Sequence, residues 1–209
     1  MTAVLRVYRI PFSTNVERVS LALAHKGLEV EWIDVDPADR SEVERVSDQP
    51  LVPVLVHDDE MVFDSTNILH YLESFQPEPH LFPERSPRRT ELDLFLDWFN
   101  KVWKRPPNEI EAEQSRPEPD ELRIARLGSE LEGYTALFEN LLARRDYLFG
   151  EEFSAADCAA FPFLKYGLIY DEADTEEFHV ILREHLWLVA DEYPRLEAWI
   201  RRVDERPRA

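Results

Sequence analysis

The sequence has 209 residues, which is enough for one large domain or two small ones. Its 44% hydrophobic and 32% charged residues are typical of a globular chain and exclude a disordered or collagen-like one. The formal net charge is −19, which argues against nucleic acid and against an anionic membrane surface, because both attract Lys and Arg. An anionic ligand would have to meet a local positive potential.

Cysteine and histidine usage excludes several kinds of site. Cys158 is the single cysteine, so there is no internal disulfide and no zinc site of several cysteines. Its apolar helical context predicts a buried packing residue. The six histidines show no metal-ligand spacing, so we expect no metal. The first residues show no leader pattern, and no apolar run is long enough to span a membrane, so we expect a cytoplasmic protein.

Residues 1–75 alternate short β-like runs with short helical runs. The turn at Asp58-Asp59 joins the last two β-like runs directly, so these two strands should pair antiparallel. The earlier runs are separated by helical runs, which are the crossovers that parallel pairs need. We therefore expect an α/β domain with a mixed four-stranded sheet. The predicted strands are 5–10, 28–35, 52–56 and 61–63, and the predicted helices are 16–26, 37–46 and 68–75.

The chain changes character after its first third. Residues 76–86 contain three prolines and read as a linker between a domain at 1–75 and an all-helical domain at 87–209. The segment 105–120 is rich in Pro and Glu and is predicted to be an exposed loop or an irregular continuation of the preceding helix, which Pro106-Pro107 should break or kink. The predicted helices of this bundle are 92–103, 127–142, 159–164, 178–189 and 196–203.

Pro53 interrupts an otherwise strand-like run. Proline cannot donate to a β-ladder, so it belongs at a strand start or edge. A cis Val52–Pro53 bond would leave the main-chain groups of Val52 open to another peptide. The alternative is an ordinary trans proline at a sheet edge.

Two segments have the pattern of a helix start. Asp64-Ser65-Thr66-Asn67 precedes an apolar stripe, and exposed N–H groups there favour a carboxylate. Ser65 could donate to that carboxylate and Asp64 could accept from an ammonium group, which suits an α-amino acid; the alternative is plain capping. Ser13 lies at another helix start, where its hydroxyl either caps or donates to an anion. No neighbouring residue resembles a base, so a nucleophilic serine is not expected.

These features, in this order, resemble the cytosolic glutathione transferases, and the resemblance covers nearly the whole chain. Each motif is weak alone, but the set at these separations is specific. The motifs are Ser13 after the first strand, Val52-Pro53-Val54-Leu55, Asp64-Ser65-Thr66-Asn67-Ile68-Leu69, the capping box Ser154-Ala155-Ala156-Asp157, and the closing helix Tyr193-Pro194-Arg195-Leu196 with Trp199 and Arg206-Pro207.

The resemblance implies a thioredoxin-like N-terminal domain that binds glutathione as co-substrate. Val52, before Pro53, would pair with the cysteinyl part of the tripeptide, and Asp64 and Ser65 would hold its γ-glutamyl end. Phe12-Ser13-Thr14-Asn15-Val16-Glu17-Arg18 is similar to the omega-class pattern with Ser in place of Cys. Ser13 is therefore the first candidate for the thiol donor, Asn15 the second and Tyr8 the third, and the remaining alternative is a site without a dedicated donor.

Two positions depart from the family pattern. Leu51 occupies the place of a Lys or Gln that makes a polar contact to the peptide, and Thr14 replaces a common proline. The affinity for glutathione, and even the identity of the thiol, stay open at this point.

The function implied is transfer of the glutathione thiol to a small, hydrophobic electrophile. Plausible walls of the electrophile pocket are Phe12, Phe99, Trp103 and Tyr166, although Phe99 and Trp103 fit a bundle core equally well. Two alternatives remain: a catalytically silent interaction module, and a glutathione-dependent isomerase or dehalogenase. Resemblance also implies a homodimer. The absence of a cysteine at position 13 argues against thiol-reductase chemistry.

Overall fold

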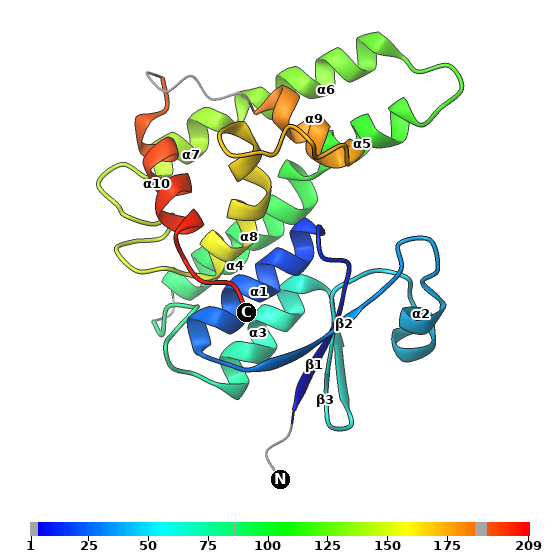
Figure 1. The fold of residues 1–209 in the computed structure, drawn as a ribbon. Coiled ribbons are helices and arrows are strands. Elements are labelled where there is room, and N and C mark those ends of the chain that lie inside the picture. The colour runs from blue at the N-terminus through cyan, green and yellow to red at the C-terminus, as the bar shows by residue number, and fades with distance from the viewer. Residues whose placement is uncertain (1–3, 86, 187–191) are drawn as a thin grey trace. The chain divides into compact units, whose positions relative to one another are not determined.

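The computed structural model describes residues 4–85, 87–186 and 192–209 (Figure 1). Contacts divide them into two units: residues up to Arg89 together with Arg206–Ala209, and Thr90–Glu205. The proline-rich segment predicted as a linker thus contacts the first unit, as does the segment that follows the last helix.

The first unit is built on a mixed four-stranded sheet, which confirms the predicted architecture. Its strands are β1 (Leu5–Arg9), β2 (Val30–Asp34), β3 (Val54–His57) and β4 (Glu60–Phe63), in the order β2-β1-β3-β4. β1 runs parallel to β2 and antiparallel to β3, and β4 forms the expected hairpin with β3. Pro53 lies just outside β3, where a residue without an N–H costs the ladder nothing.

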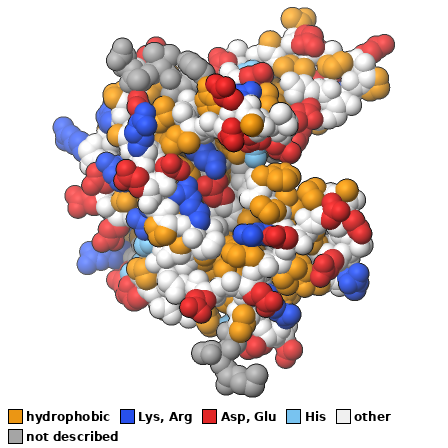
Figure 2. Space-filling view, viewed as in Figure 1, with side chains coloured by type: hydrophobic (Ala, Val, Ile, Leu, Met, Phe, Trp, Pro, Cys, Tyr) orange, Lys and Arg blue, Asp and Glu red, His pale blue; other side chains and the backbone are white. Residues whose placement is uncertain are grey.

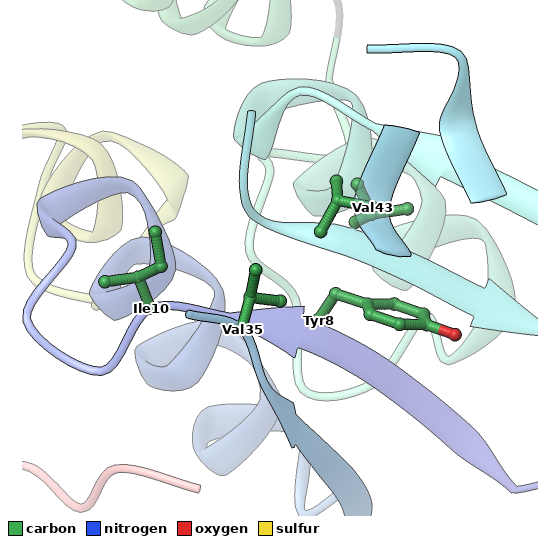
Figure 3. Close-up of a cluster of buried hydrophobic side chains, with 5 residues drawn as sticks. Tyr8, Ile10, Val35 and Val43 are labelled. Carbon is green, nitrogen blue, oxygen red and sulfur yellow. The ribbon is translucent and has the colours of Figure 1, made fainter. Parts of the chain in front are cut away.

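Helices cover both faces of this sheet (Figure 1). α1 (Thr14–Lys26) and α3 (Ser65–Phe75) pack together on one face, and α2 (Ser41–Ser47) lies on the other. On the α2 side, one buried cluster joins Tyr8, Ile10, Val35, Val43 and Val54 (Figure 3). This packing fixes the carboxyl end of β1, from which the chain turns into α1.

Local chemistry sets the ends of these helices. Gly27 ends α1 as predicted, with a φ of 63° that other residues adopt with difficulty. α2 begins at Ser41 and not at Pro37, because the carboxylates of Asp36 and Asp39 accept from the N–H groups of Ala38 and Ser41 and form turns.

The second unit is helical, as expected, and no strand occurs among its described residues. Its elements are α4 (Arg88–Trp98), a π-helical turn η1 (Phe99–Trp103), α5 (Arg105–Gln114), α6 (Glu121–Gly133), α7 (Thr135–Leu141), α8 (Ala155–Leu164), a 3-10 turn η2 (Lys165–Gly167), α9 (Glu177–His185) and α10 (Pro194–Asp204).

Two predictions in this unit are wrong. Residues 105–114 form a regular helix and neither an exposed loop nor an irregular continuation, because Pro106 and Pro107 occupy the first turn of α5, where no N–H is needed. The single helix expected at 127–142 is divided into α6 and α7 after Gly133, a weak helix former. α6 also begins earlier than predicted, since Asp120 caps it through the N–H groups of Leu122 and Arg123. Residues 187–189 of the predicted 178–189 helix lie outside the described residues.

A buried ion pair attaches the proline-rich segment to the first unit. Lys26 Nζ lies 2.7 Å from Glu73 Oε2 and also donates to the carbonyl oxygens of Gln76, Pro77 and Pro79. Glu73 in turn accepts from the N–H of Leu81. In the described part of the chain, no helix has the length and apolarity needed to cross a membrane.

Candidate functional site

The strand register brings three separate segments to one edge of the sheet. Tyr8 of β1 is opposite Val54 of β3, and Val54 is opposite Phe63 of β4. The residues just before β3 and just after β4 therefore emerge beside the carboxyl end of β1, where the turn to α1 begins. Val52, Asp64 and Ser13 belong to these segments, so three of the residues singled out in the sequence share one edge.

Ser13 is the N-cap residue of α1, but its side chain forms no capping hydrogen bond. Its main-chain N–H donates to the carbonyl oxygen of Ile10 over 3.0 Å, which holds the turn after β1. The side chain is half-buried. The hydroxyl is thus held at the positive end of a helix dipole without being used to cap that helix.

The other two donor candidates lie in different surroundings. Tyr8 is 7% exposed, and its ring belongs to the hydrophobic cluster under α2 (Figure 3). Asn15 lies in the first turn of α1 and is half-buried. Of the three candidates, Ser13 alone sits at the cap position of α1.

The Val52–Pro53 peptide bond is cis. Val52 lies outside the ladder, and its N–H and C=O have no hydrogen-bond partner among the residues that the structure describes. Its neighbour Leu51 is 64% exposed. The N–H of Leu51 donates to Oε1 of Gln49, and the carbonyl oxygen of Leu51 accepts from Nε2 of the same side chain. The segment therefore presents an unpaired peptide edge beside an exposed apolar side chain.

Asp64 caps α3 and adopts an unusual backbone conformation. Its Oδ1 accepts from the N–H groups of Thr66 and Asn67, at 2.8 and 3.3 Å. Asp64 therefore caps α3 through Oδ1, as one of the two interpretations predicted. Its Oδ2 has no partner among the described residues. The φ of 68° with ψ of 125° costs of order 1–3 kcal/mol for a residue with a Cβ. Strain of this kind concentrates at ligand sites.

Ser65 is 4% exposed and meets a buried cation that sequence reasoning missed. Nη1 of Arg18, itself 1% exposed, donates to Ser65 Oγ over 3.2 Å. The main-chain N–H of Ser65 has no acceptor in the described structure, because Ser65 begins α3. The sequence of α1 gives no clear signal for this, because polar residues are spread along the helix and only its packing shows that Arg18 is buried.

Positive potential is therefore local to this edge. The N-termini of α1 and α3 and the guanidinium of Arg18 converge there, whereas the face drawn in Figure 2 mixes acidic and basic side chains without a continuous basic surface. This is the local field that an anionic ligand needs in a chain with a net charge of −19.

The predicted wall residues of an electrophile pocket are divided between the two units. Phe12, in the first unit, is 49% exposed. Phe99 and Trp103 are fully buried in the second unit, where their rings stack with centroids 4.5 Å apart. Tyr166 is also buried and stacks on His179. The structure thus places Phe99 and Trp103 in the core of the helical unit, and a pocket that includes all four residues stays a prediction.

The predicted capping box is present, and the carboxylate of its Asp157 accepts four hydrogen bonds. Asp157 Oδ2 accepts from the N–H and the hydroxyl of Ser154, at 2.9 and 2.8 Å. Oδ1 accepts from the N–H of Leu148 and from Nε1 of Trp199. Cys158, the next residue, is buried as expected.

Two domain families match this chain. The sequence model of the glutathione S-transferase N-terminal domain matches residues 7–80, and that of the C-terminal domain matches residues 96–207. Glutathione S-transferase GstB of Escherichia coli is 26% identical over 204 residues, which cover 93% of this chain and 90% of the relative. A stringent starvation protein A homolog of Pasteurella multocida is 28% identical over 148 residues, which cover 70% of this chain and 67% of the relative.

Solved structures agree on the fold. A Tau class glutathione S-transferase from mango superimposes with a TM-score of 0.80 at 19% identity, covering 97% of this chain and 89% of the other. A glutathione S-transferase from Rhodospirillum rubrum superimposes with a TM-score of 0.74 at 23% identity, covering 97% and 89%. The N-terminal unit is accordingly thioredoxin-like, as the resemblance implied.

Proposed function

Because this chain belongs to the glutathione S-transferase family, we propose that it binds glutathione and activates the thiol for attack on a small, hydrophobic electrophile. The observation that carries this proposal is the hydroxyl of Ser13, held at the start of α1 and not used to cap it. A serine kept only for capping would have its oxygen on the amide groups of the first turn.

The binding roles follow from the groups left open at the sheet edge. The N–H and C=O of Val52, next to Pro53, pair with the cysteinyl residue of glutathione as a short antiparallel contact. The N–H and hydroxyl of Ser65 receive the γ-glutamyl carboxylate, with the charge of Arg18 behind them. Oδ2 of Asp64 accepts from the γ-glutamyl ammonium.

The Ser13 hydrogen bond and the α1 dipole are strong enough to lower the pKa of a bound thiol to near neutral pH. A free thiol has a pKa of about 8.5, so only a few per cent is thiolate at neutral pH. A charge-assisted hydrogen bond from Ser13 is worth about 1.5–3 kcal/mol, which corresponds to a decrease of one to two pKa units. The α1 dipole adds about 0.3–1 kcal/mol. Together they make thiolate the main species.

The chemical step then needs little more than proximity. The thiol proton leaves to solvent, and the sulfur lone pair forms a carbon–sulfur bond with the electrophile. The displaced group departs with its electron pair, or, in an addition, the carbanion formed takes up a proton. The protein's contribution is the thiolate and the position of the two reactants. An isomerase or dehalogenase would use the same thiolate on a different electrophile.

The proposal is tested first by binding. Calorimetric titration should give a dissociation constant below 1 mM for glutathione, and cysteinylglycine, which lacks the γ-glutamyl residue, should bind at least about tenfold more weakly. Ser65→Ala should remove most of this difference, whereas Ser41→Ala, at the start of α2, should not. No binding of glutathione at millimolar concentration, or equal affinity for both peptides, would overturn the proposal.

Turnover with a panel of aryl halides, epoxides and unsaturated carbonyls then separates the transferase from the silent module. Binding with an ordinary thiol pKa and no turnover would support an interaction module.

We further propose a cytoplasmic homodimer. Support for both comes from the family.

A further inference from the structure

The segment Arg206–Ala209 lies against α1, although it comes 180 residues later in the chain. The N–H of Ala209 donates to the carbonyl oxygen of Ser20, and Ser20 Oγ donates to the carbonyl oxygen of Ala209, at 3.2 and 3.0 Å. Nη2 of Arg208 lies 3.1 Å from Glu17 Oε1, and Arg206 contacts His25. Several independent contacts therefore hold this segment in register along the helix.

The same face of α1 begins at Ser13. Positions 13, 17 and 20 are spaced by four and three residues and so share one side of a helix. The N–H of Glu17 donates to the carbonyl oxygen of Ser13 over 3.0 Å, which places Glu17 one turn after the proposed thiol donor. The side chain of Glu17 is 16% exposed, so water screens its charge poorly.

A carboxylate in this position opposes the proposed chemistry. Negative charge one turn from the thiol disfavours the thiolate, which is a like charge. The other charged groups at this edge are Arg18, which faces Ser65, and Asp64, at the start of α3. Glu17 is paired with Arg208, whose Nη2 lies 3.1 Å from Glu17 Oε1.

We propose that Arg208 is a positioning residue of the active site, which neutralises Glu17 and thereby favours the thiolate at Ser13. The inference rests on the proposed function and extends it to a residue nearly 200 positions away in sequence. It makes the docked Arg206–Ala209 segment part of the site's electrostatics, and not only of the fold.

The test is the pKa of the bound glutathione thiol, followed by thiolate absorbance, in four proteins. Arg208→Gln should raise this pKa by about one unit, since it removes the positive charge that lies against Glu17. The double variant Glu17→Gln/Arg208→Gln should restore the wild-type value. Arg206→Gln is the matched control, because it removes the same charge from the same segment but contacts His25, two turns beyond Glu17.

The double variant separates charge from structure. If the segment matters only for packing, the thiol pKa of the double variant should be as high as that of Arg208→Gln, and this result would overturn the inference. Equal pKa shifts in Arg208→Gln and Arg206→Gln would overturn it as well. A depressed thiol pKa unchanged in Arg208→Gln would overturn it while leaving the proposed function intact. A wild-type protein that binds no glutathione would overturn both.

Discussion

Arg18 and Ser65 join the two helices whose N-termini form the candidate site, with Nη1 3.2 Å from Oγ. Both residues are buried, one on α1 and the other at the start of α3. The contact therefore couples the helix of the proposed thiol donor to the helix of the proposed γ-glutamyl site. It also places a full positive charge where a strongly acidic protein needs one.

Replacement of Arg18 by Met should weaken glutathione binding by about tenfold, because a hydrogen bond to a charged group is worth about 1.5–3 kcal/mol. The exposed Arg45 of α2 provides the matched control, since Arg45→Met changes the net charge equally. Calorimetry on both variants measures the difference. Equal affinities would show that the buried guanidinium has no part in binding.

Acid should weaken the attachment of the proline-rich segment. Burial alone raises the pKa of Glu73, but hydrogen bonds from Lys26 and from the N–H of Leu81 outweigh it and hold the pKa below the usual value. A depressed folded-state pKa contributes stability above the unfolded value of 4.5, and the contribution is lost as the pH falls through the folded value.

Glu73→Gln should therefore lower the free energy of unfolding by about 3 kcal/mol at pH 7, because it leaves the ammonium of Lys26 without its counter-charge. The difference from wild type should shrink as the pH falls below about 4.5. Urea unfolding across pH 3–7 measures it, with the exposed Glu78→Gln as control. A difference that stays constant over this range would contradict the linkage.

The capping box should dominate the stability of the helical unit. Burial raises the pKa of the Asp157 carboxyl against the hydrogen bonds that Leu148, Trp199 and Ser154 donate to it. Asp157→Asn places an amide N–H₂ where an acceptor is needed and should cost about 3 kcal/mol. Ser154→Ala, which removes one hydroxyl donor, should cost about 1 kcal/mol. Thermal unfolding of the two variants would contradict this account if their order were reversed.

Leu51 offers a gain-of-function test. The family resemblance implies a Lys or Gln at this place, and Leu51 is exposed without a polar group to offer. Leu51→Lys should tighten glutathione binding about two- to tenfold, because one added hydrogen bond is worth about 0.5–1.5 kcal/mol. Leu51→Ala, which removes the apolar side chain but adds no donor, should bind as wild type does. Tighter binding by Leu51→Ala would instead mean that the leucine obstructs the site.

Local patterns predict much of this fold. The glycine stop of α1, the β3–β4 hairpin, the cap at Asp64 and the capping box at Asp157 each depend on a few neighbouring residues, and the structure contains all four. The failures have equally local causes. Pro106 has the pattern of a helix breaker, and only its position in the first turn of α5 shows that it begins a helix. The apolar residues keep their helical spacing across Gly133, so the spacing alone does not show that one helix ends there.

Features that depend on contacts distant in sequence could not be predicted. The partner of Arg18 lies 47 residues away, and that of Arg208 lies 191 residues away. Tyr8 was a donor candidate by its place at the end of a strand, but only the packing of α2 shows that its ring belongs to a hydrophobic cluster. The sequence identifies which side chains could bind a ligand, and the fold decides which of them stay accessible to one.

The central claim is that Ser13 stabilises the thiolate of bound glutathione. Its most direct test is an ultraviolet titration of the bound thiol against pH in wild type and Ser13→Ala, with Asn15→Ala and Tyr8→Phe as controls. We expect a wild-type pKa about one to three units below 8.5, which returns to within about 0.7 units of 8.5 only in Ser13→Ala, where the helix dipole alone remains. A depressed pKa that survives in Ser13→Ala would contradict the assignment of Ser13, and an unshifted pKa in wild type would contradict thiol activation itself.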